Sequence, residues 1–184
     1  MKKIRFVRDE HELAQVLGNL KQQHCAHCRR TGTLNRHDKV QSNDLESADK
    51  QTVRGRRVWC SNRGRRGGCG RTMLIVFARF VPRHSTSAAM LGGLLRRLCG
   101  GGSVKSAWEW CGLPVDLQSV YHLLQRLREQ LAAVRGALLT RCAPPDSAQT
   151  DPLVSTAEHL RCAFPSASCA VEAFQHALQL PIMG

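Results

Sequence analysis

The feature that most constrains the fold of this chain is a set of four cysteines in a segment with few apolar residues. Cys25 and Cys28 form a Cys-x2-Cys pair, and Cys60 and Cys69 flank a Gly- and Arg-rich loop. The short apolar runs of residues 24–80 are too few to hold a core alone. Four thiolates satisfy tetrahedral Zn²⁺, and structural zinc contributes on the order of 10 kcal/mol or more to folding. We therefore expect these cysteines to bind a structural zinc ion.

The long spacing between Cys60 and Cys69 leaves a second ligand set open, because paired zinc ligands are usually separated by two to four residues. In this alternative one of the two cysteines only packs, and a histidine completes the site. The candidates are His24, His27 and His37, of which His37 is favoured. The chain has nine cysteines and no secretory signal, which favours reduced thiols over a disulfide framework.

The charge of the chain predicts a polyanionic partner. The sequence has 27 Lys and Arg against 14 Asp and Glu, a formal net charge of +13, and this balance is typical of proteins that bind nucleic acid. Arginines are densest around the second cysteine pair, where no acidic residue balances them. We expect them to contact DNA phosphates or guanine edges. They are Arg54, Arg56, Arg57, Arg63, Arg65, Arg66 and Arg71.

The chain is expected to be a small α+β protein. An N-terminal zinc-ribbon β-module is followed by an all-α helix-turn-helix and long-helix region. Its expected parts are a lead-in strand and helix (1–23), a zinc-ribbon-like module (24–80), a helix-turn-helix with a long helix (85–142) and a helical tail (150–181). Strands are predicted at 4–7, 33–36, 56–60 and 72–77, and helices after Asp9 and at 87–99, 104–111, 116–141, 152–164 and 167–180, the last capped by Ser166.

The segment 103–124 resembles a helix-turn-helix, with Ala107 facing inward and a turn at Gly112. A plain helical bundle is the alternative. If the motif is present, the following helix presents a polar face to the DNA groove, made by Gln118, Ser119, His122 and Arg126.

The long helix carries an apolar seam from Leu117 to Leu138 in alternating steps of three and four residues. This seam can pack against the C-terminal helices of the same chain. It can also pair with a second copy, and a homodimer would suit a protein that reads two DNA half-sites.

Together, HCAHCRRTGTLNRH at 24–37, RRVWCSNRGRRGGCGRT at 56–72 and the segment 103–124 resemble the N-terminal DNA-binding regions of bacterial insertion-sequence transposases and their accessory proteins. The resemblance implies binding to transposon ends and a transposase or recombinase partner. Such transposases carry a separate catalytic domain with three carboxylates, for which the residues after 142 are too few. The resemblance therefore implies a stand-alone accessory or regulatory factor, or the N-terminal remnant of a transposase.

We do not expect an enzyme, because the sequence has neither a nucleophile with a base nor paired carboxylates at a suitable spacing. A zinc-dependent adaptor that binds RNA or protein and assembles through its long helix is the alternative function. No apolar run is long enough to span a membrane. The expected location is therefore the cytoplasm, in association with the nucleoid.

Overall fold

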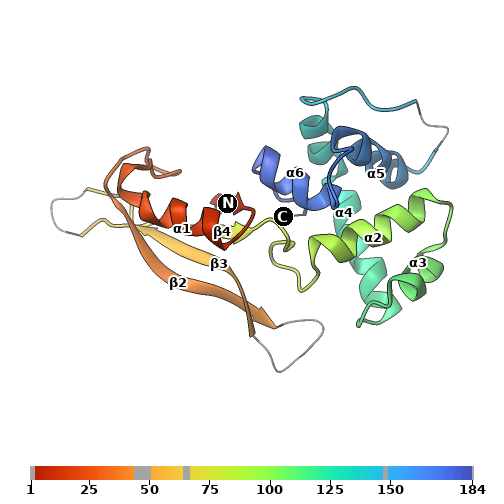
Figure 1. Ribbon diagram of the computed structural model, residues 1–184, viewed down its shortest axis with the longest axis horizontal. Helices are drawn as coiled ribbons and strands as arrows, with labels where there is room; N and C mark the ends of the chain where they lie inside the picture. Colours follow the sequence, from red (N-terminus) through yellow and green to blue (C-terminus); the bar gives the residue numbers. More distant parts are fainter. Residues whose placement is uncertain (1–2, 44–50, 64–66, 147–148, 184) are drawn as a thin grey trace. The chain divides into compact units, whose positions relative to one another are not determined.

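The computed structural model describes residues 3–43, 51–63, 67–146 and 149–183. The chain divides into two compact units, Met1–Ala78 and Arg79–Gly184. Among the described residues, four strands and helix α1 belong to the first unit and five α-helices to the second (Figure 1). The expectation of a small α+β chain in which the β-structure comes first is confirmed.

The first unit is built on a four-stranded sheet of order β1-β4-β3-β2. β1 runs parallel to β4, and the other neighbours are antiparallel. Two predicted strands match closely, but those predicted at 33–36 and 56–60 are too short. Their ladder continues through polar residues, because backbone pairing does not need apolar side chains. The strands are β1 (Lys3–Val7), β2 (Leu34–Asn43), β3 (Gln51–Cys60) and β4 (Thr72–Phe77).

Helix α1 (Glu10–Gly18) begins at the predicted cap, where the Asp9 carboxylate accepts the Glu12 N–H. Its apolar stripe, Leu13 and Val16, is buried. Arg5, on the sheet face that also carries Ile75, donates to the Gln23 side chain just after the 3₁₀ turn η1 (Leu20–Gln22). The helical segment therefore covers this face. The opposite face carries Trp59, Thr72 and Leu74.

The second unit is helical, and capping side chains set most of its helix starts. Ser87, Ser103, Asp116 and Asp151 each accept a backbone N–H of the first turn. The predicted start of the last helix, with Ser166 as its cap, is wrong. Residues 164–167 form a turn closed by the Ala167 N–H and the Phe164 carbonyl, so the helix starts later. The helices are α2 (Ala88–Cys99), α3 (Val104–Cys111), α4 (Leu117–Leu138), α5 (Pro152–Ala163) and α6 (Ala170–Leu178).

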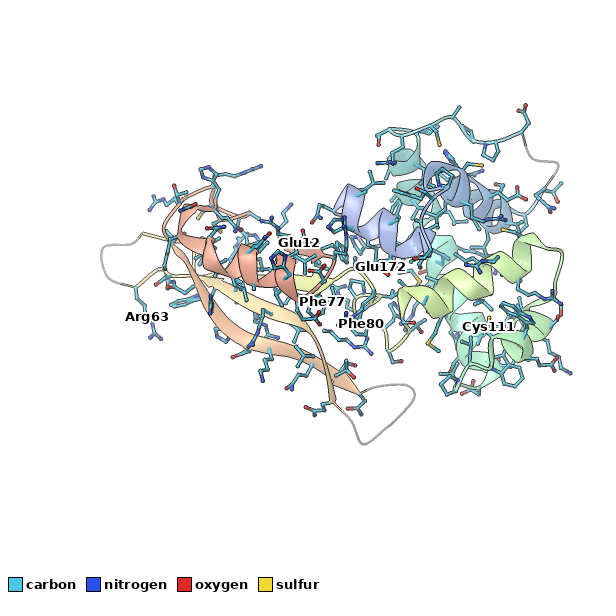
Figure 2. The ribbon with its side chains drawn as sticks, viewed as in Figure 1. Glu12, Arg63, Phe77, Phe80, Cys111 and Glu172 are labelled. Carbon is cyan, nitrogen blue, oxygen red and sulfur yellow. The ribbon has the colours of Figure 1, made fainter. Side chains whose placement is uncertain are left out.

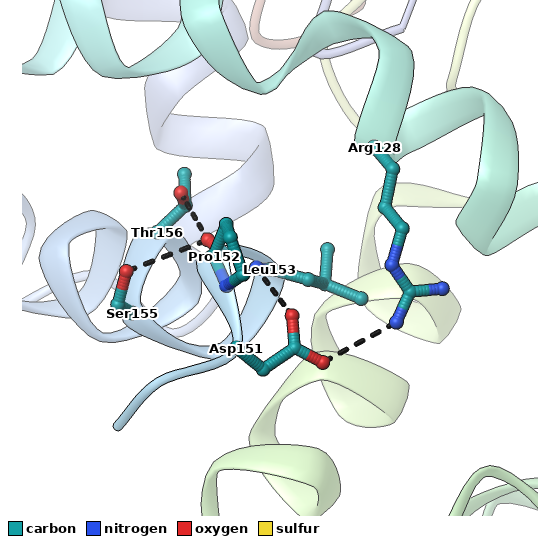
Figure 3. Close-up of polar contacts among 6 residues, drawn as sticks. All are labelled: Arg128, Asp151, Pro152, Leu153, Ser155 and Thr156. Carbon is teal, nitrogen blue, oxygen red and sulfur yellow. Dashed lines mark hydrogen bonds and ion pairs between the residues drawn. The ribbon is translucent and has the colours of Figure 1, made fainter. Parts of the chain in front are cut away.

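Asp151 joins α4 to the start of α5 (Figure 3). One carboxylate oxygen accepts the Leu153 N–H, and the other lies 3.3 Å from the Arg128 guanidinium. Thr156 and Ser155 donate to the Pro152 carbonyl in the first turn of the helix. Asp151 therefore has a capping role in this unit.

The apolar seam of α4 is buried inside the second unit. It joins α2, α5 and α6 in one core, while Leu117 at its start stays partly exposed. The buried seam residues are Val120, Leu124, Leu127, Leu131, Val134 and Leu138. A homodimer through this seam would have to remove these side chains from that core.

Among the described residues, no helix is long and apolar enough to cross a membrane.

We expect Leu124→Ala to lower the free energy of unfolding by about 2–5 kcal/mol, because it leaves a cavity in a packed core. Leu139→Ala is the matched control. Its side chain is 59% exposed, whereas that of Leu124 is fully buried, so a change within about 0.5 kcal/mol is expected. Urea unfolding followed by helical circular dichroism measures both. A neutral Leu124→Ala would show that the seam does not pack as described.

Candidate metal centre

Four cysteine thiols converge at one end of the first unit. The Sγ atoms of Cys25, Cys28, Cys60 and Cys69 all lie within 4.8 Å of one another, and the group can hold a metal ion. The pairs Cys25–Cys69 and Cys28–Cys60 are each separated by 3.7 Å. A tetrahedral ion with metal–sulfur bonds of about 2.3 Å requires sulfur–sulfur distances of about 3.8 Å. The observed spacing therefore fits four-coordinate binding without a large rearrangement.

The first cysteine pair lies on a tight backbone turn. The Cys25 carbonyl accepts the Arg29 N–H, and the Cys25 N–H donates to the Arg30 carbonyl. The His27 N–H points at the Cys25 sulfur, 3.4 Å away. Arg29 closes the turn in the left-handed region, with φ of 61°. An amide aimed at a ligand sulfur stabilises the thiolate and orients it toward an ion.

The second cysteine pair repeats this pattern of hydrogen bonds. The Cys60 carbonyl accepts the Gly70 N–H, the Cys60 N–H donates to the Arg71 carbonyl, and the Cys69 N–H lies 3.3 Å from the Cys60 sulfur. Gly70 takes the left-handed position, with φ of 69°. The two pairs therefore lie on turns closed by the same two backbone bonds, in spite of their different spacing in the sequence.

The second pair has six more intervening residues than the first, 62–67, of which 64–66 lie outside the described residues; we call these six the inserted residues. The Gly68 N–H donates to the Ser61 carbonyl at 2.9 Å, so the chain returns to the point where it left. Without the inserted residues the motif would read Cys-Ser-Gly-Cys, a Cys-x2-Cys pair like the first. A Cβ on Gly68 would lie 2.2 Å from the Ser61 carbonyl oxygen and 2.7 Å from the Cys60 sulfur. The position therefore requires glycine.

The protein environment acts differently on the two buried thiols of the cluster. Burial raises the pKa of Cys25 to about 12. Burial also acts to raise the pKa of Cys60, but its hydrogen bonds with the Thr33 hydroxyl and the Cys69 N–H outweigh burial and lower the pKa to about 7. A bound cation would replace the thiol protons and compensate the thiolate charges.

None of the three histidines considered as ligands joins the group of four cysteines. The His24 ring lies 3.0 Å from the Arg29 carbonyl oxygen, and the His27 ring lies 3.3 Å from that of Thr72. His37, the favoured alternative, is on β2 and pairs with Asp38 at 2.6 Å. Among the described residues, the group that could hold an ion therefore consists of the four cysteines alone.

The predicted DNA-contacting arginines differ in exposure. Arg63 and Arg71 are exposed, while Arg56 and Arg57 on β3 are half-buried, and Arg57 pairs with Asp38 at 3.1 Å. Arg54 must be removed from the basic surface, because its side chain is only 7% exposed and donates to the Asn43 carbonyl. Arg54 lies at a register shift between β2 and β3, where Val40 pairs with Gly55 and Gln41 with Val53, and a count of charges cannot detect its burial. The predicted residues Arg65 and Arg66 lie outside the described residues.

The predicted contact residues of the second unit all lie on the exposed side of α4: Gln118, Ser119, His122 and Arg126. The Ser119 hydroxyl donates to the capping carboxylate of Asp116, and the side chains of Gln118 and His122 lie 3.2 Å apart. Helix α3 precedes α4, with Ala107 fully buried and Gly112 closing its end in the left-handed region.

Three exposed cationic residues near the cysteines did not enter the prediction. Arg29 and Arg30 follow Cys28 directly, and Lys21 belongs to η1. The Arg30 guanidinium donates to the Gly67 carbonyl, which connects the first turn to the end of the inserted loop. The sequence did contain a signal for these residues, because residues 13–37 have no acidic residue. The prediction considered only the arginines of the second pair.

Comparison with protein-family models, with curated proteins and with solved structures finds no match. The resemblance to transposase DNA-binding regions therefore rests on the motif residues alone.

We expect the chain to bind one divalent ion with four thiolates. Cobalt substitution should give the charge-transfer bands of tetrahedral thiolate coordination. Cys60→Ser and Cys69→Ser should each weaken these bands and lower metal affinity, since each removes a ligand. Cys162→Ser is the control, because this cysteine is exposed in the second unit. Full bands in Cys69→Ser would contradict the four-cysteine site.

Deleting residues 62–67 should preserve metal binding, because it joins Ser61 to Gly68 across a gap already closed by a hydrogen bond. Gly68→Ala should instead weaken binding by displacing the Cys60 sulfur. Gly18→Ala is the control, since a Cβ there meets no atom within 4 Å. Competition with a chromogenic chelator measures all three. Loss of binding in the deletion variant would show that the loop is an integral part of the second turn.

Proposed function

We propose that this chain is a zinc-stabilised DNA-binding protein. The observation that carries the proposal is the pair of equivalent cysteine turns, whose four sulfurs match the geometry of one tetrahedral ion. Zinc is the favoured ion because four thiolates are a common structural zinc ligand set. Such a set leaves no position for water or substrate, so the ion acts as a scaffold of zinc-ribbon type and the chain carries out no chemistry there.

The surroundings of the metal centre support DNA as the partner. The exposed cations at this end are Lys21, Arg29, Arg30, Arg63 and Arg71. The chain has no acidic residue in 13–37 or 51–108 to balance them. Arg63 and Glu12, one of the carboxylates of this unit, lie at well-separated points (Figure 2). A surface of one charge sign held by rigid turns favours a polyanion.

The exposed polar side of α4 is the second proposed DNA-contacting surface, used as in a helix-turn-helix. An accessory or regulatory role in transposition or recombination, beside a transposase or recombinase, is the biological setting that the sequence motifs favour. The adaptor alternative depends on assembly through the long helix. Burial of the α4 seam within its own unit weighs against it.

Arg29→Gln/Arg71→Gln should weaken DNA binding in a salt-dependent way. The slope of log affinity against log salt concentration is negative, and each lost phosphate contact reduces its magnitude by about 0.9. The slope of the double variant should therefore be shallower by about 1.8. Arg8→Gln is the matched control. Arg8 is exposed, and its backbone N–H donates to the carboxylate of Glu12, a residue of α1. Fluorescence anisotropy with a random duplex at several salt concentrations gives the slopes.

Two results would contradict the proposal. One is DNA binding of the wild-type protein that does not change with salt. The other is an equal effect per removed charge in the Arg8 variant and in the Arg29/Arg71 double variant, which would indicate a response to net charge alone.

A further inference from the structure

Trp59 lies on the sheet face opposite α1, next to the metal centre. Strand pairing places Asn35 of β2 and Thr72 of β4 on either side of it on this face. Both neighbours are short and polar, so neither can cover an indole ring, and the Trp59 side chain stays partly exposed. A partly exposed tryptophan between small polar neighbours offers an aromatic surface to a ligand.

The metal-binding turns hold this ring in place. Trp59 directly precedes the ligand Cys60, and its indole N–H donates to the carbonyl of Gly70, the residue after the ligand Cys69. The ring is therefore connected to both ends of the second turn. Because the orientation of the ring is already fixed, the protein loses little conformational entropy when a planar ligand stacks on it.

One cationic group lies against the ring and a second contacts its neighbour. The Arg63 guanidinium lies over the ring, 5.5 Å from the centroid. The ammonium of Lys21, from η1, donates at 2.7 Å to the side chain of Asn35, which pairs with Trp59 on the neighbouring strand. An aromatic ring flanked by an arginine and a lysine is the combination that binds a planar base and the phosphates attached to it.

We propose that Trp59 is a stacking platform for an unpaired base of single-stranded DNA, and that Arg63 and Lys21 contact the adjacent phosphates. This inference rests on the DNA-binding function proposed above. It goes further by naming a substrate class, a strand with unpaired bases. The bases of an intact duplex have their faces covered by their neighbours, so a ring fixed on a sheet cannot reach them.

The test compares Trp59→Leu with the wild-type protein in the full-length, zinc-loaded chain. Binding to a single-stranded oligo(dT) should weaken on the order of tenfold or more, while binding to a duplex of equal length should change less than twofold. Trp59→Phe should keep much of the oligo(dT) binding, because it retains a ring. Trp110→Leu is the matched control, since Trp110 is the most exposed tryptophan, at 60%, and lies on α3. It should leave both affinities unchanged.

The cobalt spectrum of Trp59→Leu must match that of the wild-type protein, which separates loss of the ring from damage to the Cys60 ligand. Equal weakening for oligo(dT) and duplex, or none for either, would overturn the stacking platform while DNA binding itself stands. Failure of the wild-type protein to bind either DNA would instead overturn the proposed function. The two failures are therefore distinguishable.

Discussion

The convergence of four cysteine sulfurs is the interaction on which the first unit depends. Cys25 and Cys28 precede β2, whereas Cys60 ends β3 and Cys69 precedes β4. One ion bound to all four would therefore connect three strands and the segment after α1. The apolar core beside it is small, so this cross-link would supply stability that side-chain burial cannot. It would also restrict the two turns whose backbone carries the exposed arginines.

Much of this arrangement could be predicted from the sequence, because its signals are local. The Asp9, Ser87, Asp116 and Asp151 caps mark helix starts through hydrogen bonds to residues two or three positions later. The four-cysteine group was predicted for a similar reason: thiols are rare in polar segments unless they have a shared role. The seam of α4 was identified by its periodicity, and the choice between its partners depended on tertiary packing.

The features that could not be predicted depend on partners far away in the sequence. The wide spacing of Cys60 and Cys69 concealed a normal metal-binding turn, because its closing bond joins Gly68 to Ser61 across the inserted residues. Arg54 looked equivalent to the other arginines until strand register placed it in the interior. Strands β2 and β3 extend past their apolar residues because each provides the other's backbone partners.

The insertion separates two requirements that a zinc-stabilised DNA-binding module must meet. The sulfurs need a fixed geometry, which the hydrogen bonds of Cys25 with Arg29 and Arg30 and of Cys60 with Gly70 and Arg71 provide. A nucleic-acid surface needs exposed cations, and the segment between Ser61 and Gly68 adds Arg63 to the exposed Arg29 and Arg71 of the two turns. Placing Arg63 in an insertion keeps its charge outside the turn and over the Trp59 ring. The position of the sulfurs and the position of the Arg63 charge therefore depend on different parts of the second turn.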